Sequence, residues 1–241
     1  MSFITLVFGL NETKKFKINK TKFAKLEVIN SSLYVIFDMA MKQKITDLDR
    51  DIVILTSGKE FELFVLKDYN FDGFTDIGIL VDIGVRDINL FRDYYLFSAK
   101  KKRYVKSISN ISNLRISRKN RELIGSQKSI ESYISTIYKI SNQIPYISMK
   151  KESFMQSGIE RIRIFNKKGI LQKSIITPKF TKIKSKKSYF YLTPNGNATK
   201  RYIIRNDKIK LLDIDIKNKM IFIKFKGKKI FKRWIKIETI Q

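Results

Sequence analysis

The feature that most constrains the fold of this chain is a long series of short strand-like segments separated by turn signals. Their apolar residues are mostly isoleucine, phenylalanine and tyrosine, which favour the pleated surface of a β-sheet, whereas alanine is scarce. The segments predicted as strands are residues 4–8, 33–38, 52–56, 61–66, 77–81, 94–98, 122–125, 133–140, 161–165, 170–176, 189–192, 201–204, 208–214, 220–226 and 230–237. The sequence therefore predicts an all-β protein.

One segment has a different pattern. Residues 105–114 predict a short helix, with Ser107 or Ser109 as its N-cap. No other part of the chain is predicted to be helical.

The domain organisation is predicted from changes in pattern along the chain. Residues 143–157 lose clear alternation, and residues 179–188 form a lysine-rich bridge. The predicted domains are a β-rich domain over residues 1–150, connecting strands or a linker over 151–182, and a small β-barrel over 183–241.

The chain is strongly basic. It carries 50 lysine and arginine residues against 22 aspartate and glutamate residues, a formal net charge of +28, of which +19 falls in residues 151–241 and +9 in residues 1–150. Such a field attracts nucleic acid, acidic lipid, wall polymers or an acidic protein. The joint richness in lysine, isoleucine, asparagine, phenylalanine and tyrosine is also what an AT-rich genome produces, so the charge alone does not identify a partner.

The absence of cysteine and histidine limits the possible chemistry. It excludes disulfides, zinc sites of the usual Cys/His type, Ser-His-Asp triads and Cys-His pairs. Paired carboxylates remain possible, and the candidates are Glu60, Glu62, Asp82, Asp87 and Asp93. No glycine-rich loop that would hold a phosphate is present. We therefore expect a binding protein and not an enzyme.

The sharpest motif is the run from Asp68 to Asp76. It places side-chain oxygens at positions 1, 3, 5 and 9 and a glycine at position 6, which is the spacing of EF-hand-type calcium loops. The predicted calcium ligands are the side chains of Asp68, Asn70, Asp72 and Asp76 and the backbone carbonyl of Phe74. Position 12 is Leu80 instead of glutamate, and predicted strands flank the loop on both sides. The alternative interpretation is a solvated turn rich in aspartate and asparagine.

The calcium loop also bears on compartment. Three carboxylates without a bidentate glutamate predict an affinity of about 10⁻⁴–10⁻³ M, the range of extracellular modules. We therefore expect a periplasmic or cell-envelope protein. Residues 1–10 are apolar but lack a basic region and a small-residue cleavage site, so we expect them to form the first strand and a signal peptide to have been removed. No run approaches the roughly 20 apolar residues of a membrane span.

Two other acidic clusters have weaker patterns. Asp47, Asp49 and Asp51 lack the glycine of a calcium loop and predict an ordinary loop. Asp213 and Asp215 alternate on a predicted strand, which indicates a solvated face.

The order of motifs around the calcium loop resembles a family of calcium-loop, FG-GAP-like periplasmic proteins that includes lysozyme inhibitors and immunity proteins of secretion-system toxins. The motifs are the 68–76 loop, Tyr94-Tyr-Leu-Phe-Ser98, Arg103-Tyr-Val-Lys-Ser107, Asn110-Ile-Ser-Asn-Leu114, residues 119–126, Glu131-Ser-Tyr133 and Tyr138-Lys139. The resemblance implies inhibition of a secreted antibacterial toxin, such as a peptidoglycan hydrolase. Because the chain is basic, the target is expected to have an acidic contact face.

Residues 187–235 resemble a bacterial Src-homology-3-like barrel. The matching runs are Lys187-Ser-Tyr-Phe-Tyr-Leu-Thr-Pro194, Arg201 to Leu212, Ile221-Phe-Ile-Lys-Phe225 and Arg233-Trp-Ile235. Three departures from the pattern weaken the implied binding of wall peptide. Asn206 and Arg233 replace glycines, and Met220 or Ile221 stands where tryptophan is common.

The alternative function is a calcium-stabilised adaptor that binds the cell wall through this barrel. Its stacking residues would be Tyr189, Tyr191 and Trp234, although the barrel core is the favoured interpretation of Trp234. Basic residues also alternate with aromatic residues in 100–104 and 182–191, a pattern found where proteins bind nucleic acid. No recognition motif accompanies them, so the sequence favours solvated lysine-rich loops and does not favour a nucleic-acid partner.

Overall fold

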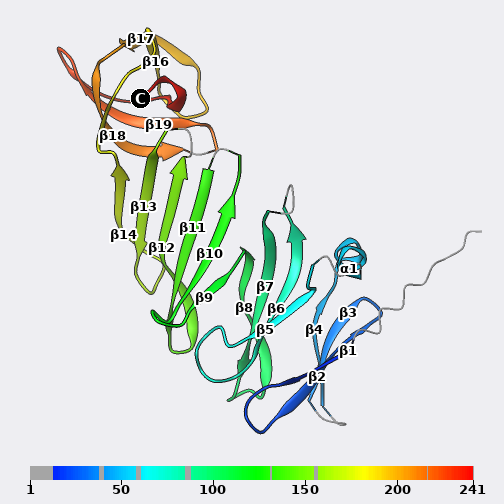
Figure 1. The fold of residues 1–241 in the computed structure, drawn as a ribbon. Helices are drawn as coiled ribbons and strands as arrows, with labels where there is room; N and C mark the ends of the chain where they lie inside the picture. Colours follow the sequence, from blue (N-terminus) through cyan, green and yellow to red (C-terminus); the bar gives the residue numbers. More distant parts are fainter. Residues whose placement is uncertain are drawn as a thin grey trace, which may run out of the picture. The chain divides into compact units, whose positions relative to one another are not determined.

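The computed structural model describes residues 13–37, 41–57, 61–84, 88–130, 132–154, 157–215 and 217–240. These residues form twenty β-strands, one α-helix and a short 3₁₀ helix, so the prediction of an all-β protein is confirmed (Figure 1). The predicted strand at 4–8 and the last residue of the predicted strand 33–38 lie outside the described residues.

The chain divides into two compact units. The first comprises Met1–Ser126 and Tyr138–Tyr146, and the second comprises Gln127–Ile137 and Ile147–Gln241. The domain bounds drawn from the sequence at residues 150 and 182 stay a prediction.

Two four-stranded antiparallel sheets belong to the first unit. The first has the order β1-β2-β3-β4, with strands Thr13–Lys17, Phe23–Ile29, Ser32–Ile36 and Lys42–Asp47. The second has the order β5-β6-β7-β8, with strands Phe64–Lys67, Asp76–Ile83, Leu90–Ser98 and Arg103–Ser112. Both are meanders in which each strand pairs with the next one along the chain, as short turn-separated strands favour.

A six-stranded sheet has the order β14-β13-β12-β11-β10-β9. Its strands are β9 Arg115–Ser117, β10 Glu122–Lys128, β11 Ser132–Ser141, β12 Ile144–Phe154, β13 Ile159–Phe165 and β14 Leu171–Thr177. Strand β12 occupies the stretch that lacks clear alternation in the sequence, because most of its residues are half-buried on both faces.

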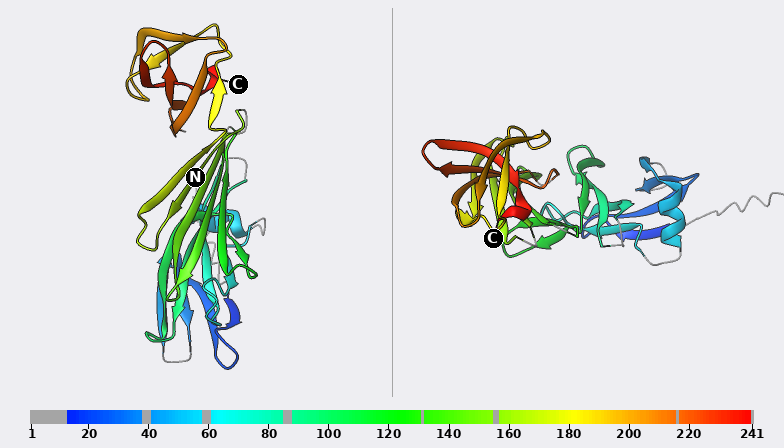
Figure 2. Two further views of the ribbon diagram at one scale, coloured as in Figure 1. Left: turned by 90° about the vertical axis from the view of Figure 1, so that its left-hand side faces the viewer. Right: turned by 90° about the horizontal axis from the view of Figure 1, so that it is seen from above.

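The second six-stranded sheet lies at the C-terminus and has the order β15-β18-β19-β20-β16-β17. Its strands are β15 Phe180–Lys182, β16 Lys187–Tyr191, β17 Ala198–Ile204, β18 Lys208–Asp215, β19 Met220–Lys226 and β20 Ile230–Lys236, followed by the 3₁₀ turn Ile237–Thr239. Figure 2 shows these strands curling round into a barrel-like sheet.

Three hydrophobic clusters fill the units. Two lie in the first unit: one joins the first sheet to α1 and to β5–β7, and the other is built around Tyr69, Tyr94, Leu123 and Tyr138. The third lies in the second unit and contains the inward residues of the C-terminal sheet together with Phe154 and Ile159. Strands β2 and β16 bury alternate residues, as expected of one-sided sheets, whereas β6 and β7 bury runs of consecutive residues. On β7, Tyr95 and Phe97 enter the first cluster, and Tyr94 and Leu96 enter the second.

The strand predicted at 52–56 is wrong, because this segment lies in helix α1, Arg50–Ser57. The Asp49 carboxylate accepts hydrogen bonds from the backbone N–H groups of Asp51 (2.8 Å) and Ile52 (3.3 Å), which caps the first turn. Ile52 is buried, whereas Ile54 and Leu55 are exposed. A one-sided helix accounts for an apolar run that looks like a buried strand in the sequence.

The helix predicted at 105–114 is also wrong, because residues 103–112 form strand β8. It pairs with β7 through Tyr104 opposite Phe97 and Ile108 opposite Tyr94, with two irregularities in register. Ser107 is therefore a strand residue and not an N-cap. The neighbouring β7 supplies hydrogen-bond partners that an isolated segment lacks, and this pairing overrides the local pattern.

Candidate functional site

The predicted calcium loop connects β5 to β6 in the first unit. Phe71 and Gly73 have positive φ values of 62° and 85°, so the chain turns through the left-handed region twice. Glycine adopts this conformation without steric cost, as the sequence motif requires.

The loop carboxylates accept hydrogen bonds from the loop backbone. Asp68 accepts from the N–H groups of Asp72 (3.2 Å) and Gly73 (2.9 Å), and Asp72 accepts from Phe74 (2.9 Å). The Asn70 Oδ1 accepts from Asp72 at 3.3 Å. These bonds turn the side chains at positions 1, 3 and 5 back towards the loop.

Asp76, at position 9, is fully buried with 0% exposure. Its two carboxylate oxygens accept hydrogen bonds from the backbone N–H groups of Tyr69 (2.8 Å) and Phe97 (2.9 Å). Burial raises the pKa of Asp76 to about 8, and the two hydrogen bonds only partly oppose that rise. Within the described ranges, no lysine or arginine forms an ion pair with this carboxylate.

Other turns of the first unit bond to this loop. The Asn70 amide donates to the Gln143 carbonyl (3.2 Å) in the β11–β12 turn. The Arg121 guanidinium donates to the Phe71 carbonyl (3.3 Å) from the β9–β10 turn and lies 5.2 Å from the Phe71 ring. Through these contacts, the loop joins turns that are distant in sequence.

The donor set of the loop fits a hard cation, because carboxylate, amide and carbonyl oxygens are the ligands that calcium prefers. A buried carboxylate without a basic partner is consistent with this chemistry. The carboxylates are not drawn together, however. Among the described residues, no three histidine, cysteine, aspartate or glutamate side chains form a group that could hold a metal. The Asn70 amide also donates to Asp72 Oδ2 at 2.9 Å. Calcium ligation stays a prediction.

Three of the other acidic residues named from the sequence have structural partners. Asp47 ends β4 and pairs with Lys44 (2.6 Å), while Asp49 caps α1. Asp93 pairs with Lys106 (2.5 Å) and accepts from the backbone N–H of Asn110. Of the remaining carboxylate candidates, Glu60 and Asp87 lie outside the described residues.

A buried ionic cluster in the second unit was not predicted. Glu152 is 3% exposed and accepts from Arg161 (2.7 Å) and Arg163 (2.9 Å) on the adjacent strand β13. Arg161 also pairs with Asp213 at 2.6 Å, and the Asp213 side chain is 52% exposed, in agreement with the solvated face predicted for it. The alternation of arginines at 161 and 163 opposite Glu152 was the available sequence signal.

The three predicted wall-binding residues lie in the C-terminal sheet. Tyr191 and Trp234 are direct cross-strand partners, and Tyr189 precedes Tyr191 by two residues on the same face of β16. The favoured interpretation of Trp234 as a core residue is wrong, because its side chain is half-buried and its neighbour Ile235 is the core residue. Sequence reasoning missed Phe222, whose ring lies 5.1 Å from that of Trp234.

The two basic and aromatic runs have different structures. Tyr104, at the end of 100–104, is buried in the first core and donates to the Thr75 carbonyl (2.8 Å). In 182–191, Lys182 ends strand β15, Ile183 forms an isolated bridge with Ile240, residues 184–186 form a loop, and the rest is strand β16.

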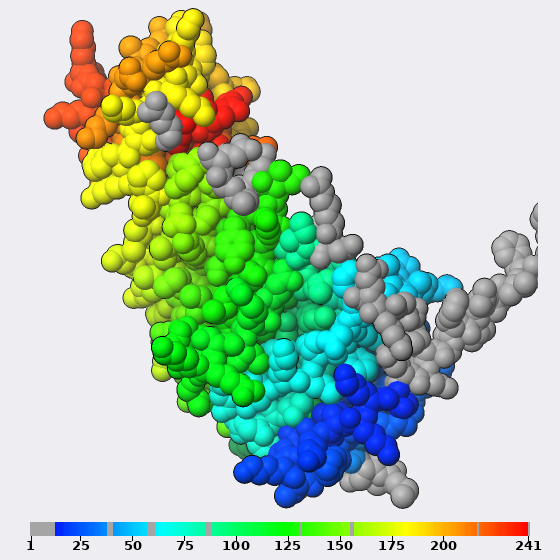
Figure 3. Space-filling model, viewed as in Figure 1, coloured from blue at the N-terminus to red at the C-terminus, as the bar shows by residue number. Residues whose placement is uncertain are grey.

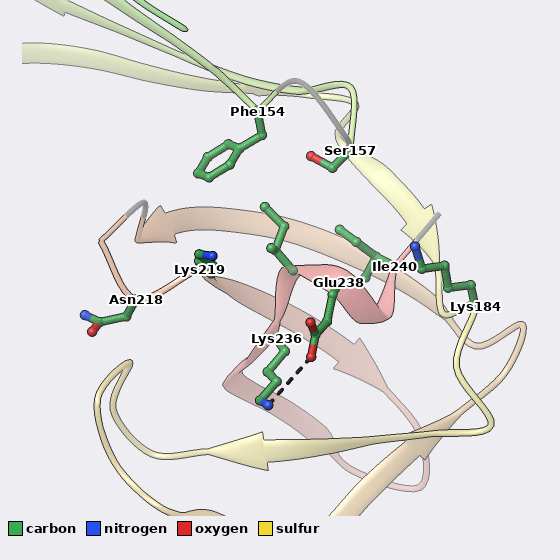
Figure 4. Close-up of a pocket in the computed structure, with 9 residues that line it drawn as sticks. Phe154, Ser157, Lys184, Asn218, Lys219, Lys236, Glu238 and Ile240 are labelled. Atoms are coloured by element: carbon green, nitrogen blue, oxygen red, sulfur yellow. Dashed lines mark ion pairs between the residues drawn. The ribbon is translucent and has the colours of Figure 1, made fainter. Parts of the chain in front are cut away.

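The second unit also contains a cavity of about 330 Å³ between the β12–β13 hairpin and the end of the C-terminal sheet (Figure 4). Its lining residues are Phe154, Ser157, Lys184, Asn218, Lys219, Lys236, Ile237, Glu238 and Ile240. Lys236 and Glu238, both lining residues, form an ion pair of 3.6 Å. The basic and aromatic run 182–191 contributes Lys184 to this cavity, whereas the predicted calcium ligands and the predicted wall-binding residues do not line it.

In the part of the chain that the structure describes, no helix has the length and apolar character of a membrane span. No family model matches the chain, and no curated protein matches it. One solved structure, described as "Structure of a Xanthomonas Type IV Secretion System related protein", is similar, with a TM-score of 0.48 and 15% sequence identity. The match covers 69% of this chain and 94% of that one.

Proposed function

We propose that this protein is a binding protein of the cell envelope that acts as an immunity protein or inhibitor of a secreted antibacterial toxin, a peptidoglycan hydrolase. The observation that carries the proposal is the set of bonds from the 68–76 loop to the β9–β10 turn, the β11–β12 turn and β7. A ligand that orders this loop would order those turns with it.

Calcium is the ligand proposed for the loop. The side-chain oxygens of Asp68, Asn70, Asp72 and Asp76 and the Phe74 carbonyl would hold it. When bound, the ion supplies positive charge to these carboxylates and stabilises the folded loop over the unfolded one.

The proposed inhibitory surface is the β9–β10 turn beside the loop. Arg118, Lys119 and Arg121 are exposed there, and Phe71 holds the Arg121 guanidinium through its carbonyl and its ring. Peptidoglycan hydrolases that cleave glycosidic bonds use paired carboxylates, which make their clefts acidic. A preordered arginine loses little conformational entropy when it enters such a cleft.

The proposal is tested by inhibition of purified peptidoglycan hydrolases with acidic clefts, measured as the clearing of sacculi. We expect stoichiometric inhibition in calcium and weaker inhibition in a chelator. Arg121→Glu should abolish inhibition, whereas the matched reversal Arg115→Glu, at an exposed position on β9, should leave it intact. Raising salt to about 0.5 M should slow association more than it speeds dissociation.

Two outcomes would count against the function. One is full activity of every hydrolase at a large excess of this protein. The other is equal damage from the two arginine reversals, which would indicate only non-specific charge attraction.

A further inference from the structure

An aromatic row crosses one face of the C-terminal sheet. Phe222 on β19 is directly opposite Trp234 on β20, and Trp234 is directly opposite Tyr191 on β16. Ile221, next to Phe222 in the chain, and Ile235, next to Trp234, are fully buried in the core. Because side chains alternate along a strand, the aromatic row lies on the outer face of the sheet.

A lysine row runs parallel to the aromatic row. Lys210, Lys224 and Lys232 are directly paired across β18, β19 and β20. On β19 and β20 the lysines stand two residues from the aromatic side chains, about 7 Å along the strand. The lysine row lies towards the turn of the β19–β20 hairpin. This hairpin projects from the second unit and is coloured orange-red in Figure 3.

The lysine row is unfavourable for the sheet itself. Like charges directly opposite one another destabilise a β-ladder. Across the described ranges, none of these three lysines forms an ion pair. An anionic ligand would remove that repulsion, so the row points to a negatively charged partner.

A second aromatic pair extends the face. Tyr189 and Tyr202 are cross-strand partners, each 43% exposed, with ring centroids 5.7 Å apart. The Lys187 ammonium lies 4.6 Å from the centre of the Tyr202 ring. Exposed aromatic rings beside ammonium groups thus continue to the edge strand β17.

We propose that this face binds single-stranded nucleic acid without sequence specificity. Phosphates would lie along the lysine row, and bases would stack on the aromatic row and on the Tyr189–Tyr202 pair. Residues 180–241 carry 18 lysine and arginine residues against 4 aspartate and glutamate residues, which supplies the long-range attraction. The inference is independent of the calcium loop and goes beyond the inhibitory function.

The chemistry of the face distinguishes this ligand from the other polyanions. A sugar chain needs carboxylate or amide partners for its hydroxyl groups. Among the described residues, the register brings two carboxylates to this end of the face, Asp213 and Asp215. Arg161 holds Asp213 at 2.6 Å, and Asn218 donates to both oxygens of Asp215 at 3.0 Å. An acidic polypeptide supplies charge but few flat rings for the aromatic row.

The single tryptophan of the chain makes the test site-specific. The full chain is titrated with a fluorescein-labelled oligo-dT of about 12 nucleotides, while anisotropy and Trp234 emission are followed together. We expect saturable binding that quenches the Trp234 emission, with the same Kd from emission as from anisotropy. We also expect a linear fall of log affinity with log salt. Oligo-U should bind with similar affinity, because the proposed contacts are to phosphates and bases and none is to the 2′-hydroxyl.

Separate variants test the lysine row and the Tyr189–Tyr202 pair. Lys224→Gln with Lys232→Gln should lower the salt slope by about 1.4, because each phosphate contact on a single strand contributes about 0.7, and Tyr202→Ala should weaken binding about tenfold. The matched control is Lys167→Gln with Lys168→Gln, which removes the same charge from the exposed β13–β14 turn of the same unit.

Several outcomes would overturn the proposal. They are no binding of oligo-dT at low salt, binding without a change in Trp234 emission, or equal losses in the control variant. Tighter binding of polyglutamate or of purified wall glycan, with quenching of Trp234, would assign the face to an acidic protein or to the cell wall instead.

Discussion

Two buried carboxylates, Asp76 and Glu152, are stabilised by different partners. Asp76 is held by backbone N–H groups in the first unit, and burial raises its pKa to about 8. Glu152 is held by Arg161 and Arg163 in the second unit. A buried carboxylate with two guanidinium partners needs no further cation. One that has only N–H donors retains part of the free-energy cost of burying its charge, and a bound cation would remove that cost.

Calcium should therefore raise the thermal stability of the protein. Millimolar calcium over a site of about 10⁻⁴ M stabilises the native state by about 1.4 kcal/mol. Melting with calcium and with a chelator measures the effect. Asp72→Ala should abolish it, and Asp82→Ala, which removes an exposed carboxylate outside the loop, should preserve it. Identical melting temperatures with and without calcium would refute calcium ligation.

Glu152→Gln should destabilise the second unit by about 3 kcal/mol, because it leaves two arginines without their shared counter-charge. Glu160→Gln is the matched control. Glu160 pairs with Lys151 (2.8 Å) at the surface, and losing that pair should cost less than about 1 kcal/mol. Urea unfolding of both variants decides the point, and equal midpoints would contradict a structural role for Glu152.

At the scale of elements, α1 shows how one cap changes the structure of a segment. Ile52 to Thr56 has the apolar, β-branched composition of a strand, yet Asp49 caps a helix there. Thr56 donates its hydroxyl to the Ile52 carbonyl (2.9 Å), which satisfies an acceptor within the helix. Packing of Ile52 in the first core then selects the helix.

Asp49→Ala should cost about 1 kcal/mol through loss of this cap, while Asp49→Asn should cost little because the amide oxygen also accepts. Chemical unfolding measures the difference. If both substitutions were equally mild, the helix would depend on packing alone.

At the scale of the molecule, each unit has its own core, and the core of the second unit reaches beyond the predicted barrel. Phe154 and Ile159 are buried among the inward residues of the C-terminal sheet. Strand β15, which ends at Lys182, pairs with β18. A fragment of residues 183–241 lacks all of these contributions.

We therefore expect a fragment of residues 147–241 to melt at a higher temperature than one of residues 183–241. Both can be compared by circular dichroism and by dispersion of their NMR spectra. Equal stability of the two fragments would show that the barrel predicted over 183–241 is complete without β12–β15.

The all-β class, most strands and the turn at Gly73 follow from the sequence, because alternation and turn chemistry act between residues close along the chain. The spacing of the 68–76 loop is local in the same way. The burial of Asp76, the pairing of Glu152 with two arginines and the alignment of Phe222, Trp234 and Tyr191 were decided by tertiary structure. Each depends on the register between paired strands, which is local for β12 and β13 but joins segments distant in sequence for β16 and β20, and a one-residue slip would turn every such side chain to the opposite face.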